Sequence, residues 1–182
     1  ILSSVVPPLN AVITEAVRKV TGLSCKLVGA GMKTGMNIRM DDPKHIGSDL
    51  IVDSVAAKAN YPLPIIVIDM GTATSITALD QNGDYVGGII HPGIRVSLNT
   101  LSGSTAQLPS IDLESPGRAL AKNTIEAMQS GILYGTAGML DGIIARMEAE
   151  LGSKATIVAT GGLARFVTPL CAHRIEIDDL LL

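Results

Sequence analysis

A buried strand that ends in an acidic residue and a small polar turn is the clearest chemical signal in the sequence. Residues 65–70 form a continuous apolar run around Asp69, as in a fully buried central strand. Gly71, Thr72 and Thr74 follow directly. The glycine lets backbone approach a ligand closely, the hydroxyl and N–H groups of such a turn suit phosphate, and Asp69 could hold a cation. The pattern predicts phosphate binding, although an ordinary hairpin whose Asp69 caps its own turn also fits.

A pair of glycines, Gly161 and Gly162, stands where a second predicted strand passes into a helix. Glycines at such a junction expose the helix N–H groups and the positive end of the helix dipole to an anion or a nucleotide. A tight turn that needs positive φ would place glycines there equally well.

Two carboxylates lie one helical turn apart in a helix expected over residues 42–60, whose first residue is the expected N-cap. Asp49 and Asp53 repel each other at this spacing, which raises the pKa of one of them and suits a general base. His45 precedes them by four residues, so a metal site of all three is conceivable, as is a solvated acidic face. Gly47, inside this expected helix, costs about 1 kcal/mol relative to alanine.

A ridge of four glycines runs along a long helix expected over residues 124–151. Small residues allow close approach by another helix, in the same chain or across a dimer, or by a nucleotide. The ridge consists of Gly131, Gly135, Gly138 and Gly142.

The elements that must position these residues alternate between apolar β-rich runs and helical patterns, which indicates an α/β fold. Three strands follow in succession at 65–70, 75–79 and 85–90, the last two joined by an Asn-Gly turn, and such a meander fits poorly with a Rossmann fold. The proline-rich break at 61–64 is the best candidate for a subdomain boundary. The remaining expected strands are 1–6, 25–28, 155–159 and 174–177, and the remaining helices are 10–20, 95–101 and 162–170.

Composition excludes several classes of protein. With 182 residues, of which 47% are hydrophobic and 17% charged, the chain can bury a core and is not a disordered tail. A net charge of -3 and only three Tyr and one Phe argue against nucleic-acid binding. Cys25 and Cys171 match no zinc or redox spacing, which favours a reducing compartment. No apolar run is long enough to span a membrane, and no signal peptide is visible.

Taken together and in order, these motifs resemble the type III pantothenate kinases of bacteria, in the acetate and sugar kinase/Hsp70/actin superfamily. The resemblance covers most of the chain, and its strings rarely occur together elsewhere. They are TGMNIRMDDPKHIGSD (34–49), VIDMGTATSITALD (67–80), GGIIHPGI (87–94), AQLPSIDL (106–113), KNTIEAMQSGILYG (122–135) and VATGGLA (158–164).

The resemblance implies an α/β fold with a ribonuclease H-like, actin-like ATPase lobe, a mixed sheet with a three-strand meander and flanking helices. Residues 63–182 would form this second lobe, and 1–62 the remainder of a truncated first lobe with the substrate helix. The family's first-lobe phosphate strand, Asp-x-Gly-Asn-Thr, would lie upstream of Ile1. We therefore expect the chain as given not to bind ATP productively.

The implied activity is ATP-dependent phosphorylation of pantothenate, the first step of coenzyme A synthesis, in a cytoplasmic homodimer without nucleic-acid or membrane partners. Asp49 resembles the catalytic base. Asp69 resembles the ligand of a monovalent cation, potassium or ammonium, and magnesium is expected with ATP. The residues that resemble substrate contacts are Met40, Gly47, Ser48, Leu50 and Thr124. The residues that resemble ATP contacts are Gly71, Thr72, Gly161 and Gly162.

Departures from the family pattern cluster on the substrate side. Leu50 stands where the family has arginine, Met40 where it has tyrosine, and Asp53 where it has asparagine. Ser48 likewise replaces alanine. Loss of the arginine removes a charge-assisted hydrogen bond worth about 1.5–3 kcal/mol to a substrate carboxylate. Two alternatives therefore stay open, a kinase of the same fold for another small hydroxyl compound and a non-catalytic relative that acts as a regulator or binding protein.

Overall fold

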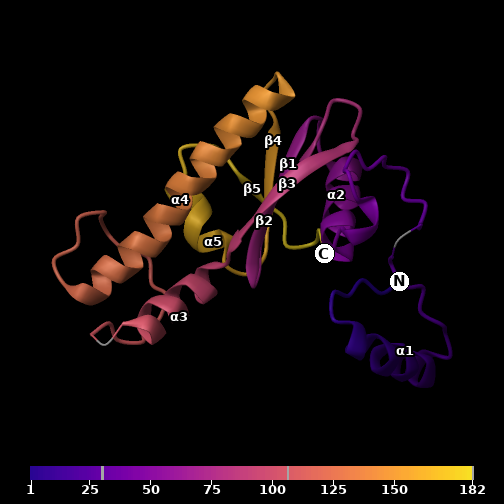
Figure 1. The fold of residues 1–182 in the computed structure, drawn as a ribbon, viewed down its shortest axis with the longest axis horizontal. Coiled ribbons are helices and arrows are strands. Elements are labelled where there is room, and N and C mark those ends of the chain that lie inside the picture. The colour runs from indigo at the N-terminus through magenta and orange to yellow at the C-terminus, as the bar shows by residue number, and fades with distance from the viewer. Residues whose placement is uncertain (30, 106, 182) are drawn as a thin grey trace.

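The structure, a computed structural model, describes residues 1–29, 31–105 and 107–181. Within these ranges it contains one five-stranded sheet with helices on both faces (Figure 1). The strands are β1 (Ile65–Met70), β2 (Ala73–Leu79), β3 (Tyr85–Pro92), β4 (Thr156–Thr160) and β5 (Glu176–Ile177). The α-helices are α1 (Pro7–Thr21), α2 (Ser48–Asn60), α3 (Ile94–Ser104), α4 (Thr124–Leu151) and α5 (Ala164–Val167).

The sheet has the strand order β3-β2-β1-β4-β5, with β1 at its centre. β1 pairs antiparallel with β2 and parallel with β4, while β2 pairs antiparallel with β3 and β4 parallel with β5. The predicted meander and the mixed sheet are therefore confirmed. Because β1 and β4 are parallel, their carboxyl ends meet at one edge, which is where open α/β sheets bind ligands.

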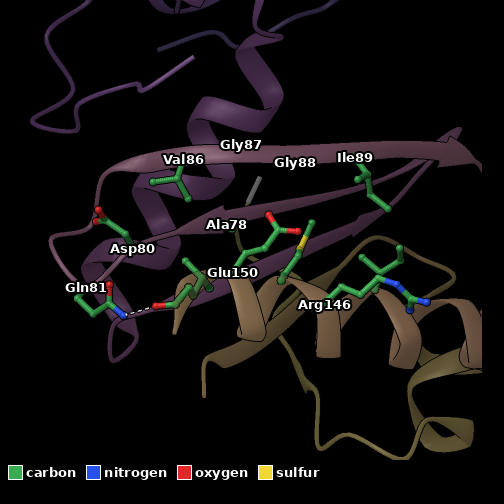
Figure 2. A pocket seen from close by; sticks show the side chains of 12 residues that line it. Ala78, Asp80, Gln81, Val86, Gly87, Gly88, Ile89, Arg146 and Glu150 are labelled. Atoms are coloured by element: carbon green, nitrogen blue, oxygen red, sulfur yellow. Dashed lines mark hydrogen bonds between the residues drawn. The ribbon is translucent and has the colours of Figure 1, made fainter. Parts of the chain in front are cut away.

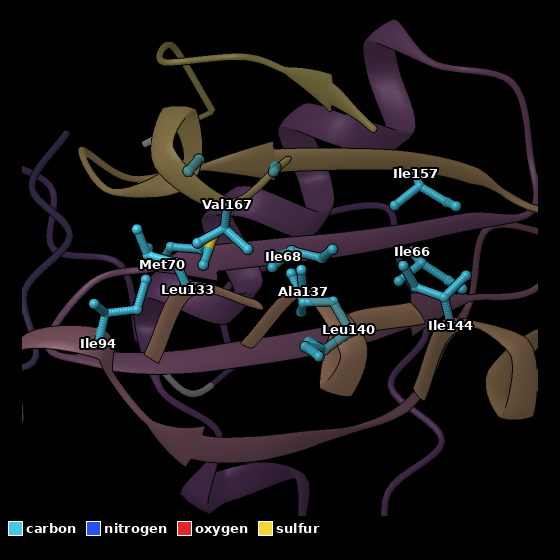
Figure 3. Packing of buried hydrophobic residues seen from close by; sticks show 13 residues of the cluster. Ile66, Ile68, Met70, Ile94, Leu133, Ala137, Leu140, Ile144, Ile157 and Val167 are labelled. Carbon is cyan, nitrogen blue, oxygen red and sulfur yellow. The ribbon is translucent and has the colours of Figure 1, made fainter. Parts of the chain in front are cut away.

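Alternation along β1 divides the core into two clusters, one on each face of the sheet. Ile66, Ile68 and Met70 pack against α3, α4 and α5 (Figure 3). Ile65 and Val67 face the opposite side and pack against α2. Each fully buried aliphatic side chain stabilises the folded state by about 1.5–3 kcal/mol relative to an exposed one. Asp69 lies at an odd-numbered position of the same strand, so its side chain belongs to the α2 face.

The long helix α4 spans the predicted residues, and both of its ends are capped. The side chain of Asn123 accepts a hydrogen bond from the backbone N–H of Glu126, which satisfies one free donor of the first turn. Gly152 ends the helix with a left-handed φ of 72°. The predicted span of 124–151 is confirmed because both ends carry local signals.

The N-terminal part differs from the prediction. Residues 1–6 and 25–28 form no strands, and only a single parallel bridge joins Leu2 to Leu27. Pro7 and Pro8, which follow the strand expected over residues 1–6, begin α1, since proline is well tolerated in a first helical turn. α1 buries none of its residues and lies apart from the sheet (Figure 1).

Two predicted helices are shorter than expected. Residues 43–45 form a 3-10 turn, and α2 begins only at Ser48, so Gly47 is its N-cap and carries no cost as a helix-interior glycine. At the other end of the chain, the helix predicted over 162–170 divides into α5 and a 3-10 helix at Thr168–Leu170. Pro169 explains the second change because it has no N–H for an α-helical bond.

The subdomain boundary near residue 62 stays a proposal. α2 precedes this boundary, yet Ala57 of α2 is fully buried against Ile65 and Val67 of the sheet. In the described part of the chain, no helix has the length and apolar character to cross a bilayer.

Candidate functional site

The turn between β1 and β2 lies between two glycines from distant parts of the chain. Gly93 donates its backbone N–H to the Thr72 carbonyl at 3.1 Å, and a Cβ on Gly93 would collide with that oxygen. On the other side, a Cβ on Gly161 would lie 2.6 Å from the carbonyl oxygen of Met70. The predicted phosphate turn is therefore held by two close backbone contacts that leave no room for a side chain.

A cavity of about 340 Å³ opens beside this turn. Gly71 and Thr72 line it from the β1–β2 turn, and Gly162 lines it from the loop after β4. Gly161 has a positive φ of 92° and precedes the lining residue Gly162. The structure thus brings the predicted ATP-contacting residues together at the carboxyl ends of β1 and β4. Their role in binding ATP stays a prediction.

The third wall of this cavity comes from α3, for which the sequence motifs indicated no role. Arg95, Val96 and Asn99 line the cavity from the first two turns of this helix. The sequence feature that could have pointed to α3 is its start directly after Pro92-Gly93. The Gly93 N–H donates a hydrogen bond to Thr72 in the β1–β2 turn and so holds α3 beside that turn. Sequence spacing alone does not reveal that contact.

Three carboxylates face one another on the opposite side of the turn. Asp49 and Asp53 come from consecutive turns of α2, and Asp69 comes from β1. Burial raises the pKa of Asp69, and the neighbouring Asp49 carboxylate raises it further. The predicted base and the predicted cation ligand therefore interact electrostatically across the helix–sheet interface.

Asp53 is the most perturbed member of this group. Its side chain is 1% exposed, and neither carboxylate oxygen has a hydrogen-bond partner among the described residues. Burial raises its pKa to about 7, with further contributions from Asp69 and then Asp49. The predicted repulsion from Asp49 contributes to the raised pKa of Asp53, but burial is the larger cause.

A metal site formed by His45, Asp49 and Asp53 is excluded. His45 belongs to the 3-10 turn rather than to α2, and its exposed Nδ1 lies 2.7 Å from the Asp42 carboxylate. Within the described ranges, no group of three His, Cys, Asp or Glu side chains could hold a metal. The break in the helix before Ser48 removes the regular four-residue spacing on which the hypothesis depended.

The start of α2 fixes the position of Asp49. The Asp49 carboxylate folds back over Gly47, where a Cβ would collide with Oδ1, and that oxygen accepts the backbone N–H of Leu50 at 2.9 Å. Ser48 ties the same turn to the N-terminal segment, because its hydroxyl donates to the Ser4 carbonyl at 3.2 Å. Gly47, Ser48 and Leu50 therefore surround the predicted base.

The other two predicted substrate contacts, Met40 and Thr124, do not belong to the first turn of α2. Met40 is 39% exposed and follows Arg39, which binds Asp84 at 2.6 Å and pairs with the backbone of Tyr85. Thr124 is exposed at the first residue of α4, and α4 packs on the sheet face opposite α2 (Figure 1). Within one chain, Thr124 does not share the face that holds Asp49.

A second cavity, of about 430 Å³, lies between the β2–β3 hairpin and the C-terminal half of α4 (Figure 2). It exists because Ala78 and Gly87 are paired small residues that leave space beneath α4. Asp80 and Gln81 border it at the hairpin end remote from the phosphate turn. None of the predicted site residues lines this cavity.

Comparison with known proteins identifies relatives that match most of the chain. The family model described as type III pantothenate kinase matches residues 1–146. The type III pantothenate kinase of Moorella thermoacetica is 46% identical over 178 residues, which are 97% of this chain and 70% of that protein. The enzyme of Dehalococcoides mccartyi is 43% identical, and the match covers 92% of this chain and 64% of that protein. The enzyme of Syntrophus aciditrophicus is 42% identical, and the match covers 100% of this chain and 71% of that protein. This chain is thus shorter than each of these relatives.

Two solved structures share the fold at 18% sequence identity. One is described as a conserved Baf family transcriptional activator from Campylobacter jejuni, with a TM-score of 0.60 over 95% of this chain and 74% of that one. The other is the activator of 2-hydroxyisocaproyl-CoA dehydratase from Clostridium difficile with bound ADPNP, with a TM-score of 0.52 over 93% and 75%. These likenesses support the actin-like ATPase architecture predicted from the sequence.

Proposed function

Because this chain belongs to the type III pantothenate kinase family, we propose that the protein transfers the γ-phosphate of ATP to the hydroxyl group of pantothenate, the first step of coenzyme A synthesis. One observation carries the proposal for these residues. Gly71, Thr72 and Gly162 line a single cavity at the ends of β1 and β4. The acidic group on α2 lies across the same strand end, where Asp49 acts on the pKa of Asp69. Nucleotide and acceptor would thus meet at one edge of the sheet.

Asp49 acts as the general base in this proposal. Its carboxylate takes the proton of the acceptor hydroxyl while that oxygen attacks the γ-phosphate and ADP leaves. Its side chain is already oriented by the backbone N–H of Leu50, and Gly47 leaves the space that it occupies. Such positioned bases contribute about 10²–10⁴-fold to rate.

Asp69 holds a monovalent cation, potassium or ammonium, in the same proposal. The charge and the free acceptors of this site suit a cation, because the Asp49 carboxylate acts electrostatically on Asp69 and both oxygens of buried Asp53 lack a partner among the described residues. They do not form a three-ligand metal cage. A cation at Asp69 would neutralise phosphate charge, and magnesium would accompany ATP.

A different small hydroxyl compound is the second candidate acceptor. Leu50 cannot pair with a carboxylate, and Met40 offers no hydroxyl. Both stand where the family uses polar contacts to the substrate. A non-catalytic binding or regulatory role is the remaining alternative, and the presence of Asp49, Asp69 and Thr72 argues against it.

We also propose a cytoplasmic homodimer that uses neither nucleic acid nor membrane. The exposed face of α4 supports the dimer. A Cβ on Gly131, Gly135 or Gly138 would meet no atom within 4 Å, so no other element of the described chain packs closely on this ridge. Size-exclusion chromatography with light scattering tests the oligomeric state.

Assay of ADP release by the full-length protein tests the proposed function. Pantothenate is compared with a panel of other hydroxyl acids, amides and sugars, and Asp49→Asn should lower kcat by about 10²–10⁴-fold without changing the Kd for ATP. Asp112→Asn, at an exposed loop aspartate, is the matched control. Phosphorylation of another acceptor alone would favour the second candidate. Full activity of Asp49→Asn would remove Asp49 from the mechanism.

A further inference from the structure

The cavity beside the phosphate turn has one cationic side chain in its lining. Arg95 lies in the first turn of α3 and faces Gly71, Thr72 and Gly162 across about 340 Å³ of space. The other lining residues are uncharged. A nucleotide that entered this cavity would therefore meet one positive charge from this chain.

The Arg95 guanidinium has no competing partner among the described residues. Within the described part of the chain, it forms no ion pair and no side-chain hydrogen bond, whereas Arg18, Arg39 and Arg165 each pair with a carboxylate. Arginine presents several donors in a planar fork that matches phosphate oxygens. An unpaired arginine on a cavity lined by a Gly-Thr turn has the chemistry of a phosphate contact.

The backbone holds α3 firmly against the turn. Gly93 donates to the Thr72 carbonyl at 3.1 Å, and α3 begins at the next residue, so Arg95 is only two residues from that contact. Ile94 and Leu98 anchor the first two turns of the helix in the core at 3% and 7% exposure. Arg95 is thus presented from a fixed helix rather than from a loop.

We infer that Arg95 binds the phosphate chain of ATP from the α3 side of the cavity, opposite the Asp69 side of the turn. This inference rests on the proposed function, and it adds a nucleotide contact that the sequence motifs did not contain. Arg95 would set the affinity for the nucleotide without taking part in proton transfer. Its position two residues after Gly93 explains how a residue outside the glycine motifs reaches the phosphates.

Binding measurements on the full-length protein test the inference. The Kd values for ATP, inorganic tripolyphosphate and adenosine are measured by calorimetry for the wild type, Arg95→Gln and Arg95→Lys. Arg95→Gln should raise the Kd for ATP and for tripolyphosphate about tenfold or more and leave the Kd for adenosine unchanged. Arg95→Lys should recover part of the loss, since it restores charge without the planar fork.

Arg146→Gln is the matched control, because Arg146 is also exposed, lacks a carboxylate partner among the described residues and lines the remote cavity of Figure 2. It should leave all three Kd values unchanged. Unchanged ATP affinity in a folded Arg95→Gln protein would overturn the inference, and so would an equal loss for adenosine or no ATP binding by the wild type. If ATP binds as expected but pantothenate is not phosphorylated, only the proposed acceptor is wrong.

Discussion

Gly161 packs directly on the end of the central strand, where its missing Cβ would lie 2.6 Å from the carbonyl oxygen of Met70. Its φ of 92° is also unfavourable for residues with a side chain. The loop after β4 and the end of β1 are therefore one packed unit. Any side chain at Gly161 must push these two segments apart.

Gly161→Ala should destabilise the protein by about 1–3 kcal/mol and weaken ATP binding, because it adds both a steric overlap and backbone strain. Gly162→Ala is the control, since a Cβ there meets no atom within 4 Å and its φ is not positive. Urea unfolding of both variants measures the difference. Equal stability of the two would contradict the packed arrangement.

Asp53 should make the protein less stable as pH rises from about 4 to about 7. Burial raises its pKa in the folded state from 3.8 to about 7. As the pH rises through this interval, Asp53 loses its proton in the unfolded chain before it does so in the folded one, which stabilises the unfolded state relative to the folded state. The resulting loss in the free energy of unfolding amounts to about 4 kcal/mol at neutral pH and disappears as the pH falls below about 4.

Asp53→Asn should therefore raise stability at pH 8 and flatten the decline between pH 4 and 7. Denaturant unfolding at several pH values checks this, with Asp112→Asn as the exposed control. If the free energy of unfolding depended on pH in the same way in Asp53→Asn and in the wild type, the raised pKa of folded Asp53 would be contradicted.

Asp69→Asn should weaken activation by potassium or ammonium, because the amide has no net charge to attract the cation beside the phosphates. The full-length enzyme is assayed across a range of potassium concentrations at fixed ionic strength. We expect a higher potassium requirement with a smaller change in the KM for pantothenate. A variant with wild-type activity and cation response would disprove this role for Asp69.

Leu50→Arg should lower the KM for pantothenate about 10–100-fold if pantothenate is the acceptor, since it restores a charge-assisted hydrogen bond next to Asp49. Leu120→Arg adds the same charge at a loop residue that is 86% exposed and should change nothing. Steady-state kinetics of both variants distinguishes a specific contact at residue 50 from a general effect of added positive charge. No gain, or a loss, in Leu50→Arg would favour another acceptor.

Elements with strong local signals were predictable from the sequence alone. The span of α4 is predicted from the helical spacing of its apolar residues, and β1 is predicted from its continuous apolar run. The motifs also identified the family, because short strings in a fixed order can be matched in the linear sequence without knowing which residues they contact.

Which of these residues lie close together depends on long-range packing. It moved the start of α2 to Ser48, which separated His45 from Asp49, and it placed Thr124 on α4, across the sheet from Asp49. It also brought Arg95 to the phosphate turn through the backbone contact of Gly93. Local propensity extends only over neighbouring residues, whereas burial and the raised pKa of Asp53 arise when a helix and a strand pack face to face. Such long-range contacts depend on how the whole sheet packs, and no short sequence window contains that information.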